Sequence, residues 1–118
     1  MRSLDIDMDA EVEKICARLR EILSGTLRRR GFVVAISGGI DSSVSTALCV
    51  RAVGEQRVYG LLLPEQDSAA ASTSRGEMLA QHVGIDYEQF NIAPTLEAIG
   101  CYQQRDEAIR SVFPDYGE

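Results

Sequence analysis

The residues best suited to chemistry in this sequence directly follow an apolar run at positions 32–36. They are two adjacent glycines, three serines and one aspartate: Gly38, Gly39, Ser37, Ser42, Ser43 and Asp41. A glycine pair lets the backbone turn its N–H groups toward an anion. Serine hydroxyls and the N-terminus of a following helix add further donors. This combination predicts a cradle for the phosphate groups of a ligand.

Asp41 needs a separate explanation, because a carboxylate repels phosphate. Its side chain either caps the helix expected to begin near this position or binds the Mg²⁺ that accompanies nucleotides. The alternative is that the whole segment has only a structural role, as an ordinary glycine turn capped by Asp41. We favour the phosphate site, because strand, loop and helix occur in the order that this chemistry requires.

Residues 37–42 read SGGIDS, which resembles the SGGxDS loop of the N-type ATP pyrophosphatases, or PP-loop superfamily. A Walker P-loop needs a lysine after its glycines and a Rossmann fingerprint needs three spaced glycines, so those nucleotide folds are disfavoured. Within the superfamily the chain looks most like the N-terminal half of NAD synthetase. The residues that favour this member are LLLP at positions 61–64, after the next expected strand, and Gly84 and Ile85 after the following helix.

The resemblance implies roles for individual residues. Those implied to hold the pyrophosphate of ATP are Ser37, Gly38, Gly39, Asp41, Ser42 and Ser43. Asp41 would also bind Mg²⁺, and Asp41 and Ser37 would be the catalytic residues. Ile36 and Leu63 would contact the adenosine at the carboxyl ends of their strands.

A reaction is implied as well. Enzymes of this kind cleave ATP between its α- and β-phosphates and adenylate a carboxylate, which ammonia then attacks; for NAD synthetase that carboxylate belongs to deamido-NAD. Prearranged hydrogen-bond donors and a metal ion can stabilise the negative charge that develops on the phosphates in such a reaction. The expected ligands are therefore ATP, Mg²⁺ and a small carboxylate substrate.

Two alternatives stay open. One is a different PP-loop enzyme, such as an asparagine or GMP synthetase domain. The other is a catalytically incomplete module for nucleotide binding or subunit assembly. The resemblance places a second metal-binding carboxylate and basic residues in a C-terminal half. We therefore expect 118 residues alone to bind nucleotide weakly, with turnover that is slight or absent.

Length and composition favour a single cytoplasmic domain, since 118 residues with 45% hydrophobic content can form one core. The net charge of −6 gives no general attraction to nucleic acid. The apolar runs are of strand length, so we expect neither a membrane span nor a signal peptide. The three cysteines, at positions 16, 49 and 101, have no CxxC spacing and are expected to be core residues.

Periodicity and turn residues predict alternating helices and strands. Helices are expected at about 9–30, 41–53, 68–83 and, as one or two, 94–113, with strands at 32–36, 57–63 and 87–92. The predicted fold is a doubly wound parallel sheet of three strands with helices on both faces, similar to the adenine nucleotide alpha hydrolases. Residues 1–31 would form an N-terminal helix and residues 32–118 the βα core of one partial domain.

The resemblance implies the strand order 3-2-1, which leaves one edge of the apolar strand 32–36 without a neighbour. A bare edge of this kind invites pairing with another chain. We therefore expect either a homodimer or the N-terminal half of a longer protein.

The second helix is expected to turn four apolar residues inward: Val44, Ala47, Leu48 and Val53.

The remaining polar residues are less informative about function. Glu65 and Asp67 either bind ribose hydroxyls or are ordinary loop carboxylates, and His82 is expected at a helix C-terminus without a catalytic role. Charged residues at 28–30, 105 and 110 are interpreted as solvated helix surface.

Overall fold

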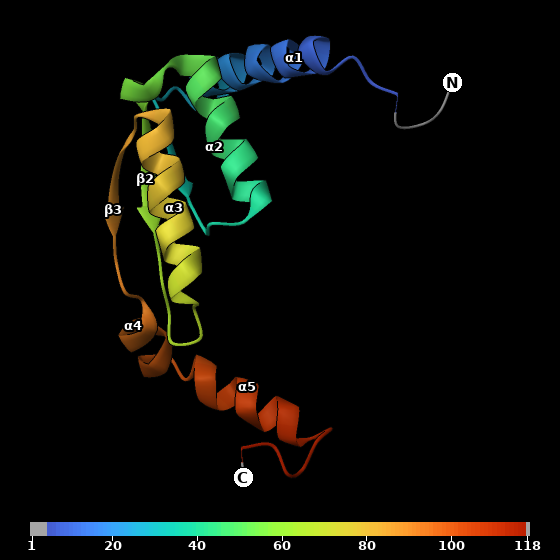
Figure 1. Ribbon diagram of the computed structural model, residues 1–118, viewed down its shortest axis with the longest axis vertical. Coiled ribbons are helices and arrows are strands. Elements are labelled where there is room, and N and C mark those ends of the chain that lie inside the picture. Colours follow the sequence, from blue (N-terminus) through green and yellow to red (C-terminus); the bar gives the residue numbers. More distant parts are fainter. Residues whose placement is uncertain (1–4, 118) are drawn as a thin grey trace.

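A computed structural model describes residues 5–117 of the chain (Figure 1). Its elements in order are α1 (Met8–Glu21), the π-helical turn η1 (Ile22–Thr26), β1 (Phe32–Ala35), α2 (Ile40–Val53), the 3₁₀ turn η2 (Glu55–Arg57), β2 (Val58–Leu62), α3 (Ala70–Val83), β3 (Asp86–Gln89), α4 (Ala93–Ala98) and α5 (Cys101–Arg110). Figure 1 shows α1 near the amino ends of the strands and α4 and α5 beyond their carboxyl ends. None of the described helices is long and apolar enough to cross a membrane.

The three strands form one parallel sheet in the order β1-β2-β3. Phe32 lies opposite Val58, and Tyr59 lies opposite Asp86. The predicted α/β fold class, the parallel strands and their order are thus confirmed. Within the described residues β1 is an edge strand, as the strand order implied.

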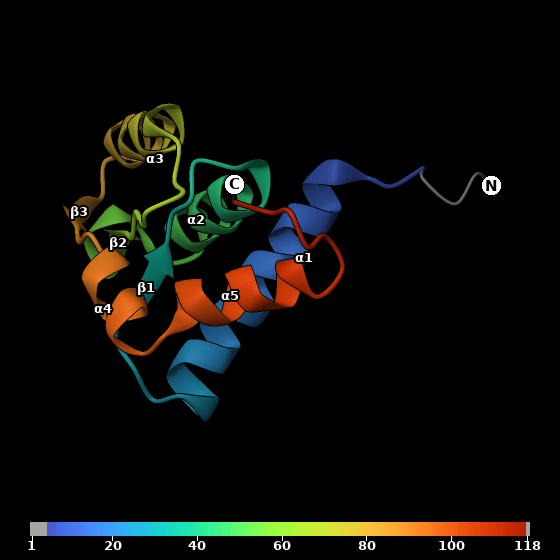
Figure 2. The ribbon, with the colours of Figure 1, turned by 90° about the horizontal axis from the view of Figure 1, so that it is seen from below.

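Helices α2 and α3 lie on the same side of the sheet (Figure 2). Both crossovers step across the sheet in the same direction, and right-handed connections then place their helices on one face. Val58 and Leu62 are buried beneath them, whereas Val33 points to the opposite face and is 67% exposed. The helices that we expected on the second face are not among the described residues.

The core lies between the covered face of the sheet and the two crossover helices. Its buried residues are Ile36, Cys49, Val58, Ala80 and Ile85. Gly76 allows α3 to approach the sheet closely, since a Cβ there would lie 3.1 Å from a methyl group of Leu62. The close contact holds the middle of α3 against the carboxyl end of β2.

Helix α1 packs on α2 rather than on the sheet. The Cys16 side chain is fully buried, and its thiol donates to Leu48 O at 3.7 Å. At the surface Arg51 forms an ion pair with Glu13 at 2.7 Å. Two cysteines, Cys16 and Cys49, are therefore core residues as predicted, but Cys101 is exposed and that prediction is wrong.

Several predicted helix details also require correction. The first helix was predicted to reach residue 30 but ends at Glu21 and continues only as η1, where Leu27 N donates to Ile22 O. The chain then reverses through Arg28 at φ +50°. The last region, expected as one or two helices, is confirmed as two, which divide at Gly100 with φ +79°. In α2 the inward assignment fails for Val44, which is 48% exposed.

Ala47 of α2, also expected inward, is exposed as well, whereas Leu48 and Val53 are half-buried as expected. The buried residues are Thr46, Cys49 and Ala52. Thr46 tolerates complete burial because its hydroxyl donates to Ser42 O at 2.7 Å. A satisfied threonine thus occupies a place that apolar periodicity had assigned to its neighbours.

Candidate functional site

The glycine loop connects the carboxyl end of β1 to the N-terminus of α2. Gly38 has φ +83°, a left-handed conformation that favours glycine. Gly39 is the N-cap of α2 in an extended conformation, with φ −85° and ψ 170°. The loop therefore lies where open α/β sheets bind ligands, at the carboxyl ends of the strands and the start of a helix.

Hydrogen bonds among the serines brace this loop. Ser37 N donates to Ser42 Oγ at 3.1 Å, and the two hydroxyl oxygens of these serines are also 3.1 Å apart. Gly39 N donates to Ser37 Oγ at 3.2 Å, and Ser43 Oγ donates to Gly39 O at 2.6 Å. The structure thus brings Ser37, Gly39, Ser42 and Ser43 together as the sequence predicted.

Gly38 is also required by the packing of α3 against the loop. A Cβ built on Gly38 would lie 2.1 Å from Ser72 O. That separation is well below a van der Waals contact, so any side chain would displace the loop or the first turn of α3. The conformation of Gly38 and its neighbour in space both demand glycine.

Asp41 lies in the first turn of α2 and is exposed. The N-cap is Gly39 and no side chain caps the helix, so the interpretation of Asp41 as the cap is wrong. A carboxylate in the first turn still interacts favourably with the positive end of the helix dipole. Among residues 5–117 its carboxylate has neither an ion pair nor a hydrogen bond, and it therefore remains available to a cation.

Mg²⁺ can be tested against the donors present. The described residues contain no cluster of three or more His, Cys, Asp or Glu side chains that could hold a metal ion. Mg²⁺ commonly binds through one or two carboxylates together with water and substrate phosphates. One exposed carboxylate beside a phosphate-binding loop fits that pattern, provided that the nucleotide supplies the remaining ligands.

The two residues predicted to contact adenosine lie at the same edge of the sheet. Ile36 and Leu63 both line a hollow of about 100 Å³ that also includes Ser37, Pro64 and Ser68. Ile36 is only 4% exposed, so most of its side chain belongs to the core. Typical small-molecule pockets measure about 300–1,000 Å³, so a nucleoside would extend over the open surface beside this hollow.

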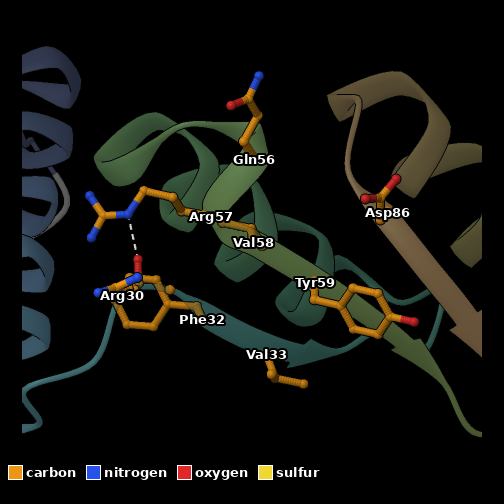
Figure 3. Close-up of a pocket in the computed structure, with 9 residues that line it drawn as sticks. Arg30, Phe32, Val33, Gln56, Arg57, Val58, Tyr59 and Asp86 are labelled. Atoms are coloured by element: carbon orange, nitrogen blue, oxygen red, sulfur yellow. Dashed lines mark hydrogen bonds between the residues drawn. The ribbon is translucent and has the colours of Figure 1, made fainter.

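A larger hollow of about 630 Å³ lies at the other end of the sheet (Figure 3). It spreads over the open face, where Figure 3 shows Val33 and Tyr59 on neighbouring strands. The Arg57 guanidinium turns to the carbonyl of Arg30 rather than toward Asp86. Parallel sheets are normally covered on both faces, so we interpret this hollow as a packing surface.

The loop after β2 contains a polar cluster that sequence reasoning missed. The Glu65 carboxylate accepts hydrogen bonds from Asp67 N at 3.1 Å and from the Tyr102 hydroxyl at 2.8 Å. The Asp67 amide, followed by the Tyr102 hydroxyl, lowers the pKa of Glu65 below its ordinary value. Burial, more than the neighbouring carboxylates, raises the pKa of Tyr102. No local sequence signal links residues 37 positions apart.

Comparison with known proteins gives a consistent result. Residues 11–112 match the family described as NAD synthase. The NH(3)-dependent NAD(+) synthetases of Mesorhizobium japonicum and Rhizobium meliloti are both 50% identical over 115 residues, covering 98% of this chain but 36% and 34% of their own lengths. The solved NH3-dependent NAD synthetase of Campylobacter jejuni superimposes with a TM-score of 0.74 at 31% identity, covering 83% of this chain and 42% of that one. The chain thus spans about a third of the length of the curated relatives it matches.

Proposed function

Because the chain belongs to the NAD synthase family, we propose that it supplies the ATP-binding part of an ammonia-dependent NAD synthetase. One observation carries this proposal: the sequence SGGIDS forms a left-handed glycine turn at the carboxyl end of β1 and the start of α2. This geometry suits the pyrophosphate portion of ATP, the substrate that the family uses.

The proposed reaction has two steps. A carboxylate oxygen of deamido-NAD attacks the α-phosphorus of ATP, the bond to the bridging oxygen breaks, and pyrophosphate leaves with that electron pair. Ammonia then attacks the carbonyl carbon of the adenylate, AMP leaves with the electrons of the carbon–oxygen bond, and a proton passes to solvent. Such chemistry needs positioned donors at the developing negative charge and no side-chain nucleophile.

The loop residues have distinct proposed roles. The backbone N–H group of Gly38 and the dipole of α2 would face the pyrophosphate oxygens. Gly39 N, which donates to Ser37 Oγ in the structure, would donate to them once Ser37 rotates. The Ser37, Ser42 and Ser43 hydroxyls rotate to donate to the same oxygens. Asp41 would hold Mg²⁺, which neutralises phosphate charge when bound.

Two alternatives differ in what the protein would do with ATP. A different PP-loop enzyme would adenylate another acceptor, such as aspartate or a nucleotide base. A nucleotide-binding module would bind ATP without cleaving it. This second alternative is supported by the absence, within residues 5–117, of any hydrogen bond or ion pair between the loop and a lysine or arginine. The sole lysine, Lys14, pairs with Glu11 on α1.

The open face of the sheet and the free edge of β1 form a surface that a partner could cover. Val33 is 67% exposed on this surface, and an unpaired apolar strand favours association. We propose that either a second copy of the chain or a further segment of the same protein covers it. Use of ATP also favours a cytoplasmic location.

The experiment is to measure pyrophosphate, phosphate and NAD formed from Mg-ATP, deamido-NAD and ammonia. We expect pyrophosphate and NAD in equal amounts, and loss of both without the acceptor. Asp41→Asn should lower nucleotide affinity by about tenfold or more, because a charge-assisted contact is lost. Asp86→Asn, which alters an exposed carboxylate on β3, is the matched control. Release of phosphate instead of pyrophosphate, or equal effects of the two variants, would contradict the proposal.

A further inference from the structure

Two residues of α5, Tyr102 and Arg105, fasten the loop between β2 and α3 to that helix. Tyr102 OH donates to Glu65 Oε2 at 2.8 Å and accepts from Gln66 N at 2.9 Å. Tyr102 is half-buried, and it reaches the loop across 36 and 37 positions of sequence. A single phenol thus contacts both a side chain and the backbone of the loop.

Further bonds lie within the loop or join it to Arg105 of α5. Glu65 N donates to Ser68 Oγ at 2.9 Å, and Asp67 N donates to Glu65 Oε1 at 3.1 Å. Arg105 pairs with Asp67, and its guanidinium carbon lies 5.2 Å from the centre of the Tyr102 ring. Both oxygens of Glu65 are therefore occupied within the protein. The sequence left open whether Glu65 binds ribose hydroxyls or is an ordinary loop carboxylate. These hydrogen bonds favour the loop carboxylate.

The two ends of this loop form part of the candidate site. Pro64 and Ser68 line the hollow that also contains Ser37 of the glycine loop. Ser68 is the residue whose hydroxyl accepts from Glu65 N. The bonds that fix the loop therefore also fix one wall of the hollow beside the proposed pyrophosphate site.

We propose that Tyr102 is a positioning residue for nucleotide binding, which holds residues 65–68 against α5 so that Pro64 and Ser68 shape the wall next to Ser37. This inference rests on the proposed function. Tyr102 itself does not line the hollow, so its effect on ATP passes through the loop. Removal of its hydroxyl should loosen the loop and weaken Mg-ATP binding while the sheet stays intact.

The test compares two tyrosines that make the same bond. Tyr59 OH also donates to a glutamate, Glu88 Oε2, at 2.8 Å, but on the open face of the sheet. Tyr102→Phe and Tyr59→Phe therefore delete equivalent groups at different places. The readouts are hydrogen exchange at the Asp67 amide, the dissociation constant of Mg-ATP and the melting temperature of the 118-residue chain. Asp67 is informative because its acceptor, Glu65 Oε1, is retained in both variants.

We expect Tyr102→Phe to accelerate exchange at Asp67 and to raise the dissociation constant, each by about fivefold, the loss typical of one hydrogen bond. Tyr59→Phe should change neither the exchange rate at Asp67 nor the dissociation constant. Both variants should have similar melting temperatures. Unchanged exchange at Asp67, or equal nucleotide affinity in the two variants, would overturn the inference. If the unmodified chain binds no Mg-ATP, the proposed function fails and the nucleotide role of Tyr102 with it, whereas exchange still reports whether the loop is clamped.

Discussion

Replacement of Gly38 by alanine tests the geometry of the glycine loop most sharply. The added methyl group meets two separate obstacles. The residue has φ +83°, which L-residues other than glycine rarely adopt, and the new Cβ would lie 2.1 Å from Ser72 O. The obstructing atom is a backbone carbonyl of α3, which cannot rotate away as a side chain would.

The magnitude follows from these two effects. A left-handed conformation costs a non-glycine residue about 1–2 kcal/mol. Overpacking against a rigid neighbour costs about 1–3 kcal/mol more. Gly38→Ala should therefore lower the free energy of unfolding by about 2–5 kcal/mol.

Gly39→Ala provides the matched control, since it adds the same methyl group one residue later. Its φ is −85°, and its nearest neighbour would be Ser37 Oγ at 3.3 Å, the end of a movable side chain. Alanine is only a poorer N-cap than glycine, so the loss should stay below about 1 kcal/mol. The assay is urea unfolding followed by circular dichroism. Equal losses for the two variants would refute the assigned conformation of the loop.

Three further outcomes follow from the structure. Leu62→Ala, at a position that is 1% exposed, should cost about 2–5 kcal/mol in urea unfolding; a cost below 1 kcal/mol would contradict the core. Arg51→Ala should cost less than about 1 kcal/mol, because the ion pair with Glu13 is exposed; a larger loss would show that this pair fastens α1 to α2. The pKa of Glu65 is lowered from its ordinary value of 4.5, chiefly by the amide of Asp67, so its contribution to stability is present above that pH and is lost as the pH falls through the lowered pKa. The difference in unfolding free energy between the wild type and Glu65→Gln should accordingly shrink below pH 4.5, and a difference that grows on acidification would contradict this sign.

The order of elements and the glycine loop were predictable because their signals are local. An apolar strand, two glycines and a hydroxyl-rich helix start lie next to one another in the sequence, and residues 37–43 form the glycine turn and the first turn of α2 accordingly. The sequence left open whether Asp41 caps the helix or binds Mg²⁺, because aspartate is both a common cap and a metal ligand. In the structure the N-cap is Gly39, two residues before Asp41 and directly after the turn at Gly38.

Features that depend on tertiary contacts were not predictable. Apolar periodicity placed Val44 on the buried side of α2, whereas Thr46 is buried instead because Ser42 O satisfies its hydroxyl. The contact of Tyr102 with Glu65 joins positions that are distant in the sequence, and neither residue type predicts the pairing. The end of α1 at Glu21 was also missed, because its hydrogen bonds shift to a π-helical turn that contains Gly25.

The most direct measurement of the central claim is a titration of the chain with Mg-ATP while its backbone amide signals are followed by NMR. The account predicts saturable shifts at Gly38, Gly39 and Ser42 that are lost in Asp41→Asn. The sheet-face residues Val33 and Tyr59, which line the larger hollow, should stay unchanged. Shifts confined to Val33 and Tyr59, or no shift in the glycine loop at saturating nucleotide, would contradict the assignment of this loop as the ATP site.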